Sequence, residues 1–271
     1  MTELGKKIRL RRIFDTKTNT TLIVPMDHAV EAYFKQLEEP GKIIKEVINA
    51  GANALLLRRG LAKLASPHYM GQAGLILRVS CATGLRNKLT EQILVSSVEE
   101  ALRLGADAVA ITVFVGSQRE TEDLRWLGML SDECDKWGMP LLGEMLPIGG
   151  EGSIPFDGPY NADDVRLAVR VGMEEGVDFI KTYYTGDIES FKKVVKYANV
   201  PVVIAGGPKV KTIYDLLKMV KDAMDSGASG ASIGRNIWMY EDPASLVKAL
   251  LKIIREKASV NEAMKELNVP L

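Results

Sequence analysis

A strand-then-helix alternation that repeats about eight times constrains the fold of this chain more than any other feature. Short β-branched or apolar runs of strand length alternate with segments whose apolar residues recur at helical spacing. The predicted strands cover residues 21–26, 54–57, 75–79, 108–114, 140–145, 179–182, 202–205 and 230–233. Eight such units predict a closed parallel (β/α)8 TIM barrel, although periodicity alone also allows a doubly wound α/β sheet.

A short glycine-containing unit precedes several of the predicted strands. The glycine stands where a helix is expected to end, at Gly51, Gly105, Gly176 and Gly227. Glycine adopts the left-handed conformation that ends a helix without steric cost, so the chain can turn there into the next strand. The sequence has no linker rich in proline, glycine or serine. We therefore expect one domain over residues 1–271, with 1–20 as an N-terminal lead-in and 258–271 as a C-terminal helical tail.

Charge and composition argue against several classes of function. Thirty-five basic residues balance 35 acidic ones, so the chain lacks the positive excess of a nucleic-acid-binding domain. Cys81 and Cys134 are too few and too far apart to indicate a disulfide scaffold or a thiolate metal site. No apolar stretch approaches the roughly 20 residues that a membrane span needs. We expect a cytoplasmic protein with no membrane or nucleic-acid partner.

The predicted sixth strand ends in a lysine, Lys181. Catalytic side chains of a barrel come from the carboxyl ends of its strands. Lys181 shares parity with Phe179 and Tyr183, so we expect it to face the interior, where burial favours the uncharged, nucleophilic amine. This predicts Schiff-base chemistry. The alternative is a lysine that extends to the rim or pairs with Asp27.

Asp27 and His28 directly follow the first predicted strand. Asp27 is the carboxylate expected to accept or deliver protons beside the amine, unless it only caps a turn. His28 is a further catalytic candidate, although a lone histidine is often just a satisfied hydrogen-bonding group. The chain has only one other histidine, His68, whereas a catalytic zinc site usually takes two or three. We therefore expect no metal and no cofactor.

The loops after the seventh and eighth predicted strands lie at the usual phosphate site of a barrel. Gly206, Gly207 and Gly234 can bring backbone N–H groups close to phosphate oxygens, and Arg235 adds a planar charged fork. This predicts a phosphorylated small-molecule substrate. The alternative is that the glycines only form tight turns and Arg235 makes a salt bridge. Asp187 is predicted to be the N-cap of the helix that follows.

With these residues in place, the chain resembles the archaeal-type class I aldolase family, which includes archaeal fructose-1,6-bisphosphate aldolase and 2-amino-3,7-dideoxy-D-threo-hept-6-ulosonate synthase. The motifs that carry the resemblance are Pro25-Met26-Asp27-His28, Gly105-Ala106-Asp107-Ala108-Val109, Lys181-Thr182-Tyr183-Tyr184-Thr185-Gly186-Asp187, Ala205-Gly206-Gly207-Pro208-Lys209 and Ser232-Ile233-Gly234-Arg235-Asn236. The resemblance implies that Lys181 is the Schiff-base lysine and that Asp27 assists proton transfer. It implies phosphate binding by Gly206, Gly207, Gly234 and Arg235, and a homo-oligomeric ring of five or ten subunits.

Two positions depart from the family pattern. Family aldolases end the fifth strand with a tyrosine general acid, where this chain has Leu146, and Ala29 replaces the glycine of Asp-His-Gly. Leucine cannot transfer a proton. Either Glu144, two residues earlier on the same strand face, supplies the acid, with a pKa raised by burial, or the reaction needs no such step. The alternative is that Glu144 forms an ion pair with Lys181 or Arg58.

These residues predict a metal-independent class I aldolase or aldol transferase acting on a phosphorylated ketose, and the family resemblance implies a transferase of the heptulosonate synthase type as one form of it. A thiolase-type acyl transfer from a phosphorylated dione to coenzyme A, using Lys181 and His28, is the second interpretation. The autoinducer-2 thiolase branch of the family also lacks the fifth-strand tyrosine. A third interpretation is a non-catalytic barrel that binds a phosphorylated metabolite. Lys181 and Asp27 favour an enzyme, because a binding protein needs no amine in the barrel mouth.

Overall fold

Eight parallel strands close into a barrel in the described part of the computed structural model, which comprises residues 2–86, 89–148, 160–207 and 210–267. The order around the barrel is β1-β10-β9-β8-β7-β6-β3-β2. The strands are β1 (Thr21–Pro25), β2 (Ala54–Leu57), β3 (Gly74–Arg78), β6 (Ala108–Val115), β7 (Leu141–Pro147), β8 (Phe179–Thr182), β9 (Val202–Ala205) and β10 (Gly230–Ser232). Their closure confirms the predicted (β/α)8 barrel and excludes an open doubly wound sheet.

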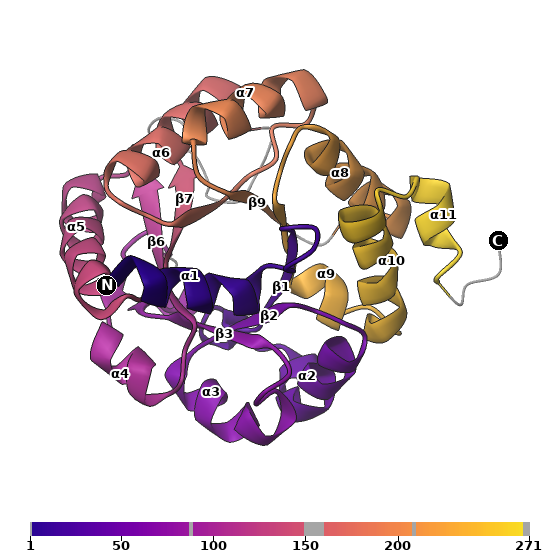
Figure 1. Ribbon diagram of the computed structural model, residues 1–271, viewed down its shortest axis with the longest axis horizontal. Coiled ribbons are helices and arrows are strands. Elements are labelled where there is room, and N and C mark those ends of the chain that lie inside the picture. The colour runs from indigo at the N-terminus through magenta and orange to yellow at the C-terminus, as the bar shows by residue number, and fades with distance from the viewer. Residues whose placement is uncertain (1, 87–88, 149–159, 208–209, 268–271) are drawn as a thin grey trace.

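Helices alternate with the strands and form a ring around them (Figure 1). The ring contains α2 (Pro40–Asn49), α3 (Arg59–Ala65), α4 (Val98–Arg103), α5 (Glu120–Trp137), α6 (Ala162–Glu174), α7 (Ile188–Ala198), α8 (Ile213–Asp225) and α10 (Pro243–Glu256). Two short helices, α9 (Arg235–Trp238) and α11 (Val260–Met264), flank α10. None of the helices in the described residues is long and apolar enough to cross a membrane.

Glycines end several of the ring helices, as the repeated unit predicted. Gly51, Gly105, Gly176 and Gly227 have φ angles between 72° and 104°. This is the left-handed region, which costs other residues more than glycine. Each glycine lies between the end of a helix and the start of the next barrel strand.

The N-terminal helix α1 (Thr2–Ile13) lies across one end of the barrel (Figure 1). It contacts residues that precede strands: Lys6 Nζ lies 2.9 Å from Asp178 and Arg12 Nη1 lies 2.9 Å from Asp107. Phe14 follows the helix and packs edge-on against Phe179 inside the barrel, with ring centroids 5.5 Å apart. The amino ends of the strands are thus covered, and the opposite end is the mouth.

A short antiparallel ribbon that the sequence analysis did not predict follows β3 at the mouth. It pairs β4 (Ser80–Cys81) with β5 (Ile93–Leu94). The Ser80 hydroxyl accepts a hydrogen bond from the Thr112 N–H at 3.2 Å, which attaches the ribbon to β6. Each strand of the ribbon has two residues, too few for an alternating pattern to reveal.

Candidate active site

Three neighbouring strands place Thr112, Glu144 and Lys181 at one level of the barrel. The register of β6 and β7 pairs Thr112 with Glu144, and that of β7 and β8 pairs Glu144 with Lys181. Leu142 and Phe179, two residues earlier on β7 and β8, belong to the apolar layer that fills the interior. Because alternate residues of a strand share a face, Glu144 and Lys181 also point inward. Lys181 therefore has the interior orientation that its parity predicted.

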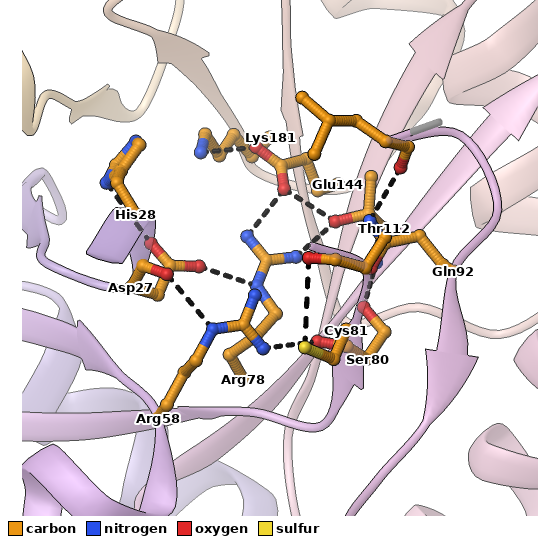
Figure 2. A network of polar contacts seen from close by, with 12 residues as sticks. Asp27, His28, Arg58, Arg78, Ser80, Cys81, Gln92, Thr112, Glu144 and Lys181 are labelled. Carbon is orange, nitrogen blue, oxygen red and sulfur yellow. Dashed lines mark hydrogen bonds and ion pairs between the residues drawn. The ribbon is translucent and has the colours of Figure 1, made fainter. Parts of the chain in front are cut away.

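Lys181 forms a short ion pair with Glu144 (Figure 2). Both side chains are buried, with residue exposures of 6% for Lys181 and 7% for Glu144. The second oxygen of Glu144 accepts a hydrogen bond from the Thr112 hydroxyl at 2.8 Å. Lys181 therefore neither extends to the rim nor pairs directly with Asp27.

Arg78, which the sequence analysis did not single out, connects the two buried carboxylates (Figure 2). Its Nε donates to Asp27 Oδ2 at 2.8 Å, and its Nη2 donates to Glu144 Oε2 at 2.5 Å. Its remaining Nη1 donates to the Thr112 hydroxyl. A signal was present in the sequence, because Arg78 shares the parity of Ile76, and a charge at an interior strand position needs buried partners.

The prediction of a raised pKa for Glu144 is wrong. Burial raises the pKa of this carboxyl, but the charges of Arg78 and Lys181, with hydrogen bonds from Lys181 and Thr112, hold it below its ordinary value. Glu144 is therefore ionised at neutral pH and cannot serve as a proton donor. The alternative prediction, that Glu144 forms an ion pair, is confirmed with Lys181 as the partner. Arg58 instead donates to the carbonyl oxygens of Asp27 and Ser80, at 3.0 and 2.8 Å.

Asp27 and His28 lie beside this group at the end of β1. Burial raises the pKa of Asp27, but the charge of Arg78 and weaker contributions from neighbouring cations leave it below its ordinary value. His28 Nδ1 lies 3.5 Å from Asp27 Oδ1. Burial lowers the pKa of His28 to about 4, although the charge of Asp27 opposes this shift. At neutral pH the pair is thus a carboxylate beside an uncharged imidazole.

The loops after β9 and β10 bring the predicted phosphate residues to the same pocket as Lys181. Gly206, Gly207, Gly234 and Arg235 all line this pocket. The Arg235 guanidinium donates to the carbonyl oxygen of Gly207 at 3.2 Å, a contact that joins the two loops. Residues 208 and 209, which completed the glycine motif in the sequence, lie outside the described residues.

The glycines of these loops serve different purposes. Gly207 has a φ of 63°, in the left-handed region. A Cβ at Gly234 would lie 2.5 Å from the carbonyl oxygen of Pro25, so only glycine fits there. The N–H of Gly206 donates to the Ser232 carbonyl oxygen at 3.1 Å. Gly206 therefore shapes the loop and does not offer its N–H to a ligand.

Apolar and aromatic side chains form the wall above Lys181. Leu146 packs with Phe114 and Tyr183 in a small buried cluster at the mouth. Tyr160 stacks on Tyr183 with ring centroids 3.7 Å apart and planes 5° from parallel. Leu146 thus continues an apolar surface. Ala29 is exposed in the short 3-10 helix His28–Val30.

Asp187 and the two cysteines, which the sequence analysis also discussed, do not line the pocket that contains Lys181. Asp187 is the N-cap of α7, and its side chain accepts from the Ser190 N–H at 2.9 Å, as predicted. Cys81 and Cys134 are free thiols. Within the described ranges, no group of three or more histidine, cysteine, aspartate or glutamate side chains could hold a metal ion.

Sequence comparisons relate the chain to aldolases. Residues 21–240 match the profile of the DeoC/LacD family aldolases. The chain is 37% identical over 261 residues to 2-amino-3,7-dideoxy-D-threo-hept-6-ulosonate synthase 1 of Archaeoglobus fulgidus, a match that covers 96% of this chain and 95% of that protein. It is 30% identical over 256 residues to 2-amino-4,5-dihydroxy-6-oxo-7-(phosphonooxy)heptanoate synthase of Streptomyces griseus, covering 94% and 92% of the two chains.

A structural comparison gives a similar result. An archaeal fructose-1,6-bisphosphate aldolase, solved with its catalytic lysine covalently bound to the carbinolamine intermediate of the substrate, superposes with a TM-score of 0.82. The two sequences are 32% identical, and the match covers 92% of this chain and 99% of that structure.

Proposed function

Since this chain belongs to the DeoC/LacD family of aldolases and is a class I aldolase, we propose that Lys181 forms an imine with a phosphorylated ketose. The enzyme then breaks or makes a carbon–carbon bond next to the imine carbon. The imine serves as an electron sink for the enamine left after cleavage. The main support is the position of Lys181, an amine buried at the carboxyl end of a barrel strand.

The ion pair with Glu144 suits this chemistry. A protonated imine is a cation, and a carboxylate fixed beside it stabilises that charge in a site with little water. Glu144 is in register with Lys181 and is held ionised by Arg78. We therefore assign Glu144 to charge stabilisation at Lys181. Asp27, also kept ionised, is placed to accept hydrogen bonds from hydroxyl groups of the ketose.

The phosphate of the substrate is assigned to the loops after β9 and β10. Arg235 supplies a cation there, and Gly207 and Gly234 keep the backbone free of side chains. These residues line the pocket that contains Lys181, so one ligand can reach both.

A borohydride trapping experiment tests this proposal. Incubation with fructose 1,6-bisphosphate and other phosphorylated ketoses, followed by reduction, should leave one covalent label on Lys181, located by mass spectrometry. Lys181→Met should lose both the label and turnover, whereas Lys196→Met, on the exposed surface of α7, should keep both. A label on another lysine, or full turnover in Lys181→Met, would show the assignment to be wrong.

Thiolase-type acyl transfer is a second candidate, favoured by His28. Its imidazole is uncharged at neutral pH, and the Asp27 carboxylate beside it would stabilise the imidazolium formed on proton transfer, which offsets part of the basicity lost through burial. The test is product analysis with a phosphorylated 2,4-dione and coenzyme A. An acyl-thioester product that disappears in His28→Gln would favour this reaction over aldol chemistry.

We also propose a cytoplasmic homo-oligomer of five or ten subunits, from the family resemblance. Exposed apolar side chains support self-association: Leu4 and Ile8 on α1 are 63% and 49% exposed, and Met129 and Trp137 on α5 are 53% and 40% exposed. These two helices contact each other, so association could bury the four side chains together. Light scattering during size-exclusion chromatography measures the subunit number, and a monomer would contradict the proposal.

A further inference from the structure

Glu31 is an acidic residue of the pocket that neither the sequence analysis nor the proposed mechanism uses. It directly follows the 3-10 helix His28–Val30 after β1 and lines the same pocket as Lys181, Asp27 and Glu144. Within the described residues its carboxylate makes no hydrogen bond and no ion pair. This distinguishes Glu31 from Asp27 and Glu144, which are both bound to Arg78.

The backbone of Glu31 is held in place by the loop after β4. A Cβ built on Gly84 would lie 1.6 Å from the Glu31 carbonyl oxygen, so the two backbones touch and only glycine fits. The Glu31 N–H also donates to the His28 carbonyl oxygen at 2.8 Å. The residue is therefore fixed at the pocket wall, while its carboxylate has no partner among the described side chains.

The charges that face Glu31 come from several strands. Burial raises the pKa of Glu31, the carboxylates of Asp27 and Glu144 raise it further, and Arg235 and Arg78 oppose the rise, leaving it at about 7. Lys181, His28 and Arg58 also line the pocket. At neutral pH, Glu31 exists in both protonated and ionised forms. Asp27 and Glu144 stay ionised and His28 stays uncharged.

We propose that Glu31 is the proton carrier of the aldol reaction. This inference rests on the proposed imine chemistry at Lys181. Aldol cleavage needs one group that takes a proton from a substrate hydroxyl and later returns a proton to carbon. Glu31 is a pocket carboxyl that is not committed to an ion pair, and it can perform both steps.

In this scheme the proton that Glu31 takes from the substrate hydroxyl is the one that it returns to carbon. In cleavage, the Glu31 carboxylate takes the proton of the hydroxyl next to the breaking bond, the C–C electrons move into the Lys181 imine, and an aldehyde leaves. The protonated Glu31 then gives its proton to the enamine carbon, which restores the imine. Water hydrolyses the imine, and the ketone product and the free amine of Lys181 result. Synthesis follows the same steps in reverse.

Glu31→Gln tests the proposal, because glutamine preserves the shape but cannot transfer a proton. With the phosphorylated ketose that labels Lys181 in the wild type, kcat should fall about 10² to 10⁴-fold while borohydride trapping persists within about twofold. The limb of the kcat–pH profile near pH 7 should disappear. Glu31→Asp should recover part of the activity. Glu39→Gln, an exposed acid on the same connection to α2, is the matched control and should behave like wild type.

The outcomes separate this inference from the proposed function. If the wild type gives no label on Lys181, the imine mechanism itself fails. If trapping works and Glu31→Gln retains near-normal turnover with an unchanged pH profile, Glu31 is not the proton carrier. If Glu31→Gln loses trapping together with turnover, Glu31 holds the site and does not move the proton, which also overturns the proposal.

Discussion

Arg78 gives the clearest example of how one side chain sets the protonation of others. Arg78 is 5% exposed, and its guanidinium binds Asp27 and Glu144 at the same time. A buried carboxylate without a cation would bind a proton at neutral pH, because burial penalises the charged form. The charge of Arg78 therefore helps to keep both carboxylates ionised at neutral pH. Neither carboxylate can then donate a proton, so another group has to carry it.

Arg78→Met should raise the pKa of Glu144, since only Lys181 and the hydrogen bond from Thr112 would then oppose its burial. Trapping on Lys181 should be lost at a higher pH than in wild type, because protonated Glu144 no longer stabilises the imine cation. Removal of one partner from a buried ion pair should also lower the free energy of unfolding by about 3–5 kcal/mol. Trapping across a pH series and urea unfolding measure the two effects. Arg59→Met, at an exposed position, is the control; an unchanged pH dependence in Arg78→Met would contradict the argument.

Arg235→Ala should weaken binding of phosphorylated substrates without slowing the chemical step. A phosphate distant from the reacting carbon makes the same contacts in the ground and transition states. A charge-assisted hydrogen bond contributes about 1.5–3 kcal/mol, so KM should rise about 10- to 150-fold while kcat stays within about threefold. Steady-state kinetics with the phosphorylated ketose that labels Lys181 provides the measurement. Unchanged KM would remove Arg235 from the phosphate site.

At the scale of elements, α5 is attached to the barrel through a buried acid. Asp123, in the first turn of α5, is 2% exposed and accepts a hydrogen bond from the Phe114 N–H of β6 at 3.2 Å. Burial raises the pKa of Asp123 to about 6, although the hydrogen bond from Phe114 opposes the rise. The native protein therefore binds this proton more tightly than the unfolded chain does.

The contribution of Asp123 to the free energy of unfolding should consequently fall as the pH rises from about 4 to about 6. In that interval the native state holds a proton that the unfolded state has lost, and the effect amounts to about 3 kcal/mol. Asp123→Asn keeps an acceptor oxygen and should remove this slope. Urea unfolding at a series of pH values provides the test, with the exposed Asp132→Asn as control. A mutant that keeps the wild-type slope would show that another group causes it.

At the scale of the whole molecule, the apolar groups that close the barrel and the reactive groups lie at opposite ends of it. The amino ends of the strands are closed by α1 and by Phe14, which packs on Phe179. The carboxyl ends bear Lys181 and its charged partners, two residues above Phe179 on the same strand face. The apolar interior between the two ends isolates them from each other.

Phe14→Ala should therefore reduce stability more than it changes the reaction. Truncation of a buried aromatic side chain typically costs about 3–5 kcal/mol, from lost burial and from the cavity that remains. The midpoint of denaturant unfolding should fall, while kcat of the folded protein should stay within about twofold of wild type. Tyr214→Ala, on the exposed face of α8, should change neither. A large loss of kcat at full stability would contradict the separation of the two ends.

The sequence by itself was enough to predict the order of strands and helices and the orientation of Lys181, because both follow from local patterns, whereas closure of the barrel was shown only by the structure. The alternation of strands and helices determines the order of elements, and a two-residue period decides which face of β8 Lys181 occupies. The glycines at helix ends, such as Gly51, and the N-cap Asp187 were predictable for the same reason. Each depends on neighbours within a few residues.

The protonation states of the site were decided only by the tertiary structure. Arg78 and Glu144 are 66 residues apart in the chain but 2.5 Å apart in space, so no local pattern shows that this cation reverses the effect of burial on Glu144. Glu31 is likewise placed against the mouth by Gly84, from a loop that follows a different strand. A pKa depends on every charge within several ångströms and on the exclusion of water. Closure of the barrel brings those charges together, and the distances between them cannot be predicted from periodicity along the chain.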